Sequence, residues 1–230
     1  MAIREIIFDT ETTGFDPNSG DRIVEIGAVE LIDYLPTGKE FHSFINPERD
    51  IPTESTRIHG ITNETVKDSP RFSEICGNFL DFIGNDFLVA HNARFDMNFL
   101  NFQLKELGFP AIGDERVKDS LSLAKSKYPG QMNSLDALCR RFNIDLAVRS
   151  DRHGALLDSY LLADVWLELH GGRQQSMLLG EQKNQAEAQL NQSQKAEDIL
   201  KPRDFPISAE ELKNHRVFLD KYIKDSLWNK

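Results

Sequence analysis

The stretch from Ile6 to Gly14, Ile-Ile-Phe-Asp-Thr-Glu-Thr-Thr-Gly, constrains the fold of this chain more than any other. Three consecutive apolar residues predict a buried strand, and this strand runs directly into acidic residues. Because alternate side chains of a strand point to the same face, we expect Asp9 and Glu11 to lie side by side. Two carboxylates held together at a buried strand end repel each other and lose hydration, and a divalent cation relieves both effects. Taken alone, the same residues also fit a polar strand end that turns at Gly14.

The pattern along the chain predicts an α/β domain with a mixed sheet. Residues 22–32 are apolar on both alternations apart from Glu25 and Glu30, which is typical of a central strand covered on both faces. With a third strand at residues 39–45, after a turn at Pro36-Thr37-Gly38, these strands predict an antiparallel meander. From Ile51 the apolar period becomes helical, and two further short strands are expected at residues 86–90 and 116–118. Helices are expected at residues 53–60, 72–83, 94–107, 134–142 and 154–170, with Asp119 and Ser120 capping one more.

Length and composition limit the class of protein. A chain of 230 residues suits one sizeable domain with an appendage, or two small domains. It has no apolar run of membrane-span length and enters a strand at once, so we expect neither a membrane segment nor a signal peptide, and a cytoplasmic location. Cys76 and Cys139 fall in helix-like apolar patterns and are expected to be reduced core thiols rather than a disulfide or metal site.

The charge distribution argues against tight binding of nucleic acid by the chain alone. The net charge is −10, and the residues from Gln174 onward hold nine basic and nine acidic side chains, so the first 173 residues carry all of it. Such a body repels a phosphate backbone at long range. If the protein acts on DNA or RNA, we expect it to need metal ions or a partner.

Two more acidic residues lie at the start of expected helices. Asp96 falls in the first turn of a helix, where the helix dipole also favours an anion without any ligand. His91 and Asn92, just before it, are expected to fix the loop by hydrogen bonds. His153 and Asp158 would lie about 140° apart on a regular helix. They can share a site only if His153 belongs to a loop that precedes the helix carrying Asp158.

Together these residues are suited to hydrolysis of a phosphodiester. Four carboxylates without cysteine ligands, those of Asp9, Glu11, Asp96 and Asp158, favour two hard cations such as Mg²⁺ or Mn²⁺ over zinc. Two such ions about 4 Å apart can clamp a phosphate. The imidazole of His153 is suited to removing a proton from the attacking water.

Four motifs carry a resemblance to a known family. They are Phe8-Asp-Thr-Glu-Thr-Thr-Gly14, Ile58-His-Gly-Ile-Thr62, Ala90-His-Asn-Ala-Arg-Phe-Asp96 and His153-Gly-Ala-Leu-Leu-Asp158. In this order they resemble the DEDD superfamily of 3′→5′ exonucleases, specifically its histidine subclass, over residues 3 to about 170. One departure is Lys118-Asp119-Ser120-Leu121, where many relatives have Asp-Thr-Leu. A serine there keeps the hydroxyl group, so we expect activity to be retained.

The resemblance implies a fold, a metal site and a substrate. It implies a ribonuclease H-like mixed five-stranded sheet flanked by helices. It also implies that the four carboxylates are the ligands of the two divalent cations and that His153 is the general base. The terminal nucleotide would be bound by the following residues: Asp9, Glu11, Thr12, His59 and Asp158. Within the family the chain is most similar to subunits that proofread for bacterial replicative DNA polymerases, releasing nucleoside monophosphates from mismatched primer ends. Residues 133–139, Asn-Ser-Leu-Asp-Ala-Leu-Cys, share this similarity.

Two other functions share parts of this pattern. A free-standing exoribonuclease would use the same acidic cluster, because the ribose 2′-OH is distinguished by the shape of the pocket. A non-catalytic binding module would keep the fold and dock through the tail, but all five catalytic-type residues are present. The tail favours the proofreading subunit, because an RNA-trimming enzyme has no need of a tether with an apolar end.

The tail divides the chain into three expected regions: an exonuclease domain at residues 1–173, a Gln-rich flexible linker at 174–200 and a polymerase-binding segment at 201–230. Residues 174–179, Gln-Gln-Ser-Met-Leu-Leu, resemble the short peptides that dock on the bacterial sliding clamp. They also fit the start of the linker, or a piece of tail packed back on the domain. The last segment has too little apolar content to fold alone, so it is expected to order on the polymerase. The expected contacts are Phe218, Leu219, Tyr222 and Trp228.

Overall fold

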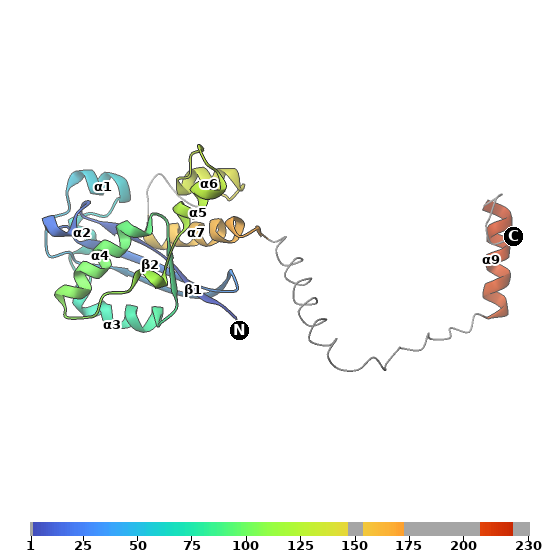
Figure 1. Cartoon of the computed structure of the whole chain (residues 1–230), viewed down its shortest axis with the longest axis horizontal. Helices are drawn as coiled ribbons and strands as arrows, with labels where there is room; N and C mark the ends of the chain where they lie inside the picture. The colour runs from blue at the N-terminus through green and yellow to red at the C-terminus, as the bar shows by residue number, and fades with distance from the viewer. Residues whose placement is uncertain (1, 147–153, 173–207, 223–230) are drawn as a thin grey trace. The chain divides into compact units, whose positions relative to one another are not determined.

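The computed structural model describes residues 2–146, 154–172 and 208–222 (Figure 1). The chain divides into two compact units, Met1–Leu179 and Gly180–Lys230. The strands of the first unit are β1 (Arg4–Thr12), β2 (Ile23–Ile32), β3 (Leu35–Phe44), β4 (Phe87–Ala90) and β5 (Val117–Asp119). Its helices are η1 (Pro17–Ser19), α1 (Thr53–His59), α2 (Asn63–Val66), α3 (Phe72–Ile83), α4 (Ala93–Glu106), η2 (Asp114–Arg116), α5 (Ser120–Lys127), α6 (Leu135–Arg141) and α7 (Ala155–Leu169). The second unit contains α9 (Ala209–Tyr222).

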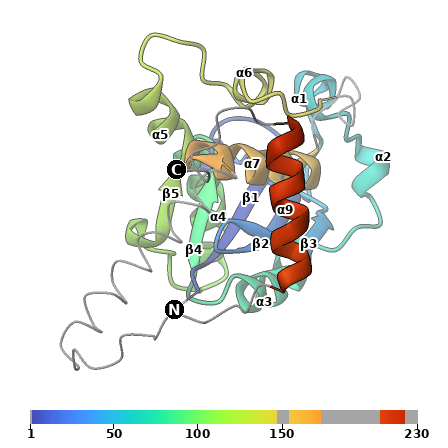
Figure 2. The ribbon, with the colours of Figure 1, turned by 90° about the vertical axis from the view of Figure 1, so that its right-hand side faces the viewer.

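The strands form one mixed sheet in the order β3-β2-β1-β4-β5, and Figure 2 shows them edge to edge. The first three strands are antiparallel neighbours, whereas β4 and β5 run parallel to β1. This confirms the predicted meander with two added strands. The strand that carries the paired acids is therefore the central one, and its end lies in the middle of the sheet.

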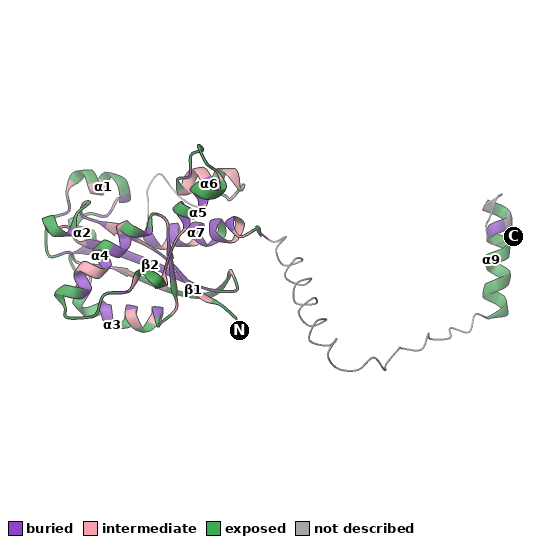
Figure 3. Ribbon diagram, viewed as in Figure 1, coloured by how far each residue is buried: buried purple, intermediate pink, exposed green. Residues whose placement is uncertain are grey.

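Two layers of helices cover the sheet, and β1 contributes to the core on both sides. Phe8 belongs to the cluster that includes Phe79 of α3 and Leu100 of α4. Ile7 points to the opposite face and belongs to the cluster that includes Val165 of α7 and Leu138 of α6. In Figure 3 β1 and β2 are accordingly almost entirely buried. The run Ile-Ile-Phe is apolar because both of its faces are covered.

The hairpin between β2 and β3 corrects the predicted turn. The turn lies at Asp33 and Tyr34, both with positive φ (50° and 68°), and Pro36 is already part of β3. Two left-handed residues match the twist of a two-residue hairpin. Tyr34 is held there by stacking on His170, with ring centroids 4.8 Å apart. The predicted turn formers instead produce a shift in register, which the β2–β3 pairing shows between Val29 and Leu31.

The remaining elements agree with the sequence apart from small differences. The short helix α2 was not predicted, and β5 begins and ends one residue later than expected. Asp119 caps α5 as expected, since its side chain accepts from the backbone N–H of Leu121. Cys76 and Cys139 are buried in the clusters on opposite faces of the sheet, as expected for separate core thiols. None of the helices in the described ranges is long and apolar enough to cross a membrane.

Candidate active site

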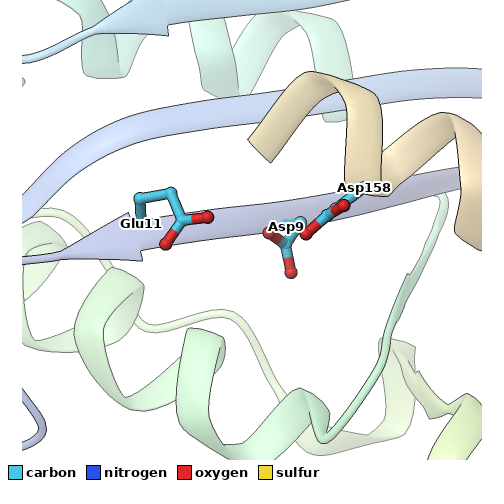
Figure 4. A group of neighbouring side chains, drawn as sticks. All are labelled: Asp9, Glu11 and Asp158. Atoms are coloured by element: carbon cyan, nitrogen blue, oxygen red, sulfur yellow. The ribbon is translucent and has the colours of Figure 1, made fainter. Parts of the chain in front are cut away.

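Three of the predicted carboxylates meet at the end of the central strand. Asp9 and Glu11 project from β1 and Asp158 from the first turn of α7, as Figure 4 shows. One oxygen from each of the three lies within 4.8 Å of the others. The expectation that alternation along β1 would pair the two strand acids is therefore met. The third acid comes from α7, far along the sequence from β1.

The close packing of α7 on β2 is what brings Asp158 to this point. In the β1–β2 ladder Asp9 is paired with Gly27. A Cβ atom at Gly27 would lie only 2.1 Å from the backbone nitrogen of Leu156, so the first turn of α7 rests directly on the glycine. The hydroxyl of Ser159 also donates to the Gly27 carbonyl at 2.9 Å. A helix that touches β2 beside Asp9 carries its first-turn acid to the same place.

Asp96 is anchored to the same strand by a different contact. It is buried in the first turn of α4, and its Oδ1 accepts from the backbone N–H of Thr10 at 3.1 Å and from the Thr10 hydroxyl at 2.6 Å. Its carboxylate is not one of the three that gather within 4.8 Å. Thr10 was not predicted as a site residue, and only its place between the two strand acids could have drawn attention to it.

The electrostatics of the cluster follow from burial and like charge. Burial raises the pKa of Asp9 well above its usual value, and the charges of Asp96, Glu11, Asp158 and Glu25 raise it further. Burial also raises the pKa of Asp96 to about 7, against the opposing effect of the hydrogen bonds from Thr10. The largest charge effects on Asp9 thus all come from carboxylates. Such a set of oxygen donors fits a hard divalent cation, whose charge would offset this repulsion.

The loop before α4 is fixed by hydrogen bonds, as predicted. Asn92 adopts a left-handed conformation (φ 70°), and its backbone N–H donates to Asp119 Oδ1 at 3.0 Å. His91 Nδ1 and the Ser120 hydroxyl are 2.9 Å apart, and the same hydroxyl donates to the Ala90 carbonyl at 3.0 Å. The serine in place of threonine therefore keeps its hydrogen bonds, and the start of the helix that carries Asp96 is tied to β5.

The two residues expected to line the nucleotide pocket lie on the neighbouring elements. Thr12 ends β1, is buried, and donates its hydroxyl to the Gly14 carbonyl at 2.6 Å. His59 ends α1, is buried, and accepts at Nδ1 from the backbone N–H of Ile61 at 3.0 Å. A hydrogen bond of 2.9 Å from Ser55 to the Thr13 carbonyl ties α1 to the end of β1.

His153, the expected general base, lies outside the described residues. The helix α7 begins at Ala155, with Gly154 as its N-cap. His153 therefore precedes the helix in the sequence, which is the condition under which it could share a site with Asp158.

Glu25 lies near the site, although its sequence pattern predicted no role for it. It is buried on β2, opposite Glu11 in the ladder. Its Oε1 lies 2.7 Å from His42 Nε2, and this hydrogen bond raises the pKa of His42. Its Oε2 accepts from the backbone N–H of Ala155 at 3.1 Å. An acid in a strand otherwise apolar on both faces was the signal that could have identified it.

Comparison with known proteins gives this architecture a class. A model described as exonuclease matches residues 6–166, a range that includes all four carboxylates, and the chain belongs to this family. Its relatives narrow the class further. The chain is 45% identical over 231 residues to DNA polymerase III subunit epsilon of Rickettsia felis, covering 97% of this chain and 98% of the relative. It is 38% identical to the subunit of the same name from Haemophilus influenzae, covering 99% and 95%.

Solved structures share the fold of the first unit. Exonuclease X in complex with 5′ overhanging duplex DNA is 27% identical, with a TM-score of 0.58, and the match covers 72% of this chain and 90% of that one. The nuclease domain of 3′hExo, a DEDDh family member bound to rAMP, is 19% identical with a TM-score of 0.63, covering 74% and 94%. At that identity the second comparison supports the fold alone.

Proposed function

We propose that this chain is the proofreading epsilon subunit of a bacterial DNA polymerase III, acting in the cytoplasm as a 3′→5′ exonuclease on mismatched primer ends. The observation that carries the proposal is the meeting of three carboxylates from β1 and α7 within 4.8 Å, in a chain that matches the exonuclease family across the whole site. The relatives named DNA polymerase III subunit epsilon, covered almost end to end, supply the biological setting.

The carboxylates of the site would hold two divalent cations, Mg²⁺ or Mn²⁺. Asp9, Glu11 and Asp158 form the gathered set, and Asp96 would complete it from α4. When bound, such ions neutralise charge on the scissile phosphate and align the attacking and leaving oxygens. The protein contributes the rigid placement of the donors: β1 is central in the sheet, and both helices that carry aspartates are hydrogen-bonded to neighbouring strands.

The other predicted residues act on the substrate and on its water. Thr12 and His59 lie on adjoining elements tied together at Thr13, where they would orient the terminal nucleotide. His153 would take the proton from the attacking water, because an imidazole changes its protonation state near neutral pH. In the sequence it directly precedes Gly154, the N-cap of the helix that carries Asp158.

A mismatch assay tests this function directly. The purified full chain is incubated with Mg²⁺ and a DNA primer carrying a 3′ mismatch, with a fully paired primer and a matching RNA as comparisons. We expect nucleoside monophosphates to be released from the 3′ end, faster from the mismatched primer because its end is unpaired. Preferential degradation of the RNA would instead support the exoribonuclease, and no release from any substrate would support a binding module.

The partners are proposed from the tail. Helix α9 exposes Leu212, Val217 and Phe218 (51%, 58% and 53%), whereas Leu219 is buried. We assign the exposed residues to contacts with the polymerase alpha subunit, because aromatic and aliphatic anchors dominate such interfaces. The expected contact Trp228 and the side chain of Tyr222 lie outside the described residues. A flexible linker of the length of residues 181–197 has a root-mean-square reach of roughly 20–25 Å, which gives an effective concentration in the millimolar range.

Two variants of the chain separate docking from catalysis. Leu212→Asp with Val217→Asp, or removal of everything after Arg173, should abolish co-elution with the polymerase and mismatch correction. Either change should leave degradation of single-stranded DNA about unchanged. Leu35→Asp is the control, since this leucine is similarly exposed (59%) but belongs to β3 of the first unit. Co-purification of the truncated chain with the polymerase would place the contact on the exonuclease domain instead.

We also propose that residues 174–179, which lie outside the described residues, bind the sliding clamp. The supporting observation is the Gln-led, apolar-ended sequence Gln-Gln-Ser-Met-Leu-Leu. A peptide of these residues should bind the clamp as an extended anchor, and Met177→Ala with Leu179→Ala should abolish binding. Absence of binding at millimolar peptide would assign the segment to the linker.

A further inference from the structure

Glu25 is a buried acid that is not among the three carboxylates gathered at the site. Its side chain is 6% exposed, and burial of a carboxylate is costly unless its oxygens accept hydrogen bonds. Both oxygens do so. Oε1 is bound by His42 Nε2 at 2.7 Å, and Oε2 by the backbone N–H of Ala155 at 3.1 Å. One contact lies within the β2–β3 hairpin, and the other reaches a helix 130 residues further along the chain.

The contact with Ala155 satisfies a group that the helix itself leaves without a partner. The first N–H groups of any helix have no intrahelical acceptor, and a side chain at the N-cap commonly supplies one. In α7 the N-cap is Gly154, and it makes no side-chain capping hydrogen bond. Glu25 supplies the acceptor from β2. It also places a negative charge at the N-terminus of the helix, where the helix dipole favours an anion.

The capped turn is the one that carries a catalytic carboxylate. The backbone N–H of Asp158 donates to the Gly154 carbonyl at 2.8 Å, so Asp158 belongs to the same turn as Ala155. The three contacts that set this turn against β2 are the Glu25 hydrogen bond, the Ser159 hydrogen bond and the touching backbone at Gly27. Of the two hydrogen bonds, the one to Glu25 is made by Ala155, the first residue of the helix.

We propose that Glu25 is a positioning residue of the exonuclease site: oriented by His42, it clamps the start of α7 to β2 and so holds Asp158 against Asp9. This inference rests on the proposed function for its effect on hydrolysis. The clamp itself is a property of the fold, and it can be measured without any substrate.

The alternative role is that of a further metal ligand, because Glu25 is close enough to the cluster for its charge to act on Asp9. Substitutions separate the two roles. In Glu25→Gln the amide oxygen can accept from Ala155, and the amide NH₂ can donate to His42 in its neutral form. The glutamine therefore keeps both contacts and loses the charge. In Glu25→Ala both the contacts and the charge are lost.

Glu30→Ala is the matched control. Glu30 is on the same strand, is also buried (2% exposed) and is bound by Arg4 and by the Thr37 hydroxyl. Its loss should destabilise the protein in the way that loss of any buried, hydrogen-bonded acid does. Its hydrogen-bond and ion-pair partners, Arg4, Thr37 and Lys39, are not residues of the site, so kcat at a temperature where the variant is folded should stay unchanged.

The experiment measures kcat and KM on single-stranded DNA, Mn²⁺ affinity, and amide hydrogen exchange of the metal-free full chain. For Glu25→Ala we expect faster exchange at the amides of Asp158 and Ser159 and a fall in kcat of about 10²-fold, the effect of a 1 Å misplacement, with KM little changed. For Glu25→Gln both values should return to within a few-fold of the wild type. Glu30→Ala should alter neither.

Two results would overturn the inference. If Glu25→Gln were as impaired as Glu25→Ala in kcat and Mn²⁺ affinity, the charge rather than the contacts would matter, and Glu25 would act as a ligand. If exchange at the start of α7 were the same in Glu25→Ala and the wild type, no clamp would exist. An inactive wild type would refute the proposed function alone, because the exchange experiment involves no reaction.

Discussion

Adding a single methyl group at Gly27 should move Asp158 of α7 away from Asp9 and Glu11 of β1. Alanine at this position would place a Cβ atom 2.1 Å from Leu156 N and 2.3 Å from the carbonyl carbon of Ala155. Both are backbone atoms of α7, so no side chain can rotate away to make room. The helix itself has to withdraw from β2, and Asp158 moves with it.

The size of the effect follows from the geometry. Cβ atoms essentially never approach other heavy atoms below 3.0 Å, so the contact at 2.1 Å must lengthen by about 0.9 Å. Overpacking of this kind costs about 1–3 kcal/mol of stability. A displacement near 1 Å of a group that positions the reaction lowers the rate by about 10²-fold. Gly27→Ala should therefore yield a folded protein that melts a few degrees lower and has lost most of its kcat.

The assay compares this variant with a second glycine substitution. Gly77 lies inside α3, and an added Cβ there meets nothing within 4 Å. Gly77→Ala should leave kcat unchanged and raise stability by about 0.5–1 kcal/mol, because alanine loses less backbone entropy in a helix. Thermal melts and single-stranded DNA degradation are measured on both. A Gly27→Ala protein that melts lower but keeps kcat within twofold of the wild type would show that the close packing of α7 on β2 does not determine activity.

Three further predictions address the roles of individual residues. Asp9→Ala should lose activity together with Mn²⁺ affinity, whereas His153→Ala should lose most activity and keep that affinity; equal impairment by calorimetry would refute these roles. The pKa of Asp96 in the folded state is raised from 3.8 to about 7. Between these two pH values the folded metal-free protein therefore binds more protons than the unfolded chain, and its stability falls as the pH rises. Metal-free Asp96→Asn should therefore gain in Tm over the wild type between pH 4 and 7, and a constant difference would contradict the shift. Asp119→Ala removes the acceptor for the Asn92 N–H and the cap of α5, and should lower the free energy of unfolding by about 1–2 kcal/mol in chemical denaturation. Asp119→Asn should lose less stability, because its side-chain oxygen can still accept.

The parts of this fold that could be predicted from sequence are those set by local pattern. The run Ile6-Ile7-Phe8 identifies a strand with both faces buried, because its residues supply both core clusters. The spacing of Asp9 and Glu11 places them on one face, since alternation along a strand needs no knowledge of the rest of the chain. The long helices follow from their apolar period. The end of the short helix α1 follows from its glycine stop, Gly60, which is left-handed with φ of 75°.

The parts that could not be predicted depend on distant partners. The hairpin turn requires a left-handed Tyr34, and the ring that stacks on it, His170, follows the end of α7. Asp96 is fixed by Thr10, a residue whose hydroxyl has no reason to be singled out until α4 is placed. Glu25 gains a role only from the N-terminus of a helix much later in the chain. Such contacts join residues that no local pattern connects.

Among the described elements of the first unit α7 comes last in the sequence, and this order has a consequence for how the enzyme matures. A nascent chain can complete the β-meander early, but the acids of β1 remain without their third partner until the residues of α7 have been synthesised and packed across β2. Domains fold as units during synthesis, and contacts between distant residues close late because the intervening loop must be ordered first. If these three acids form the active site as proposed, we expect the nascent chain to remain inactive until α7 has packed on β2. Cleavage of nucleic acid would then begin only after the helix that carries Asp158 is in place.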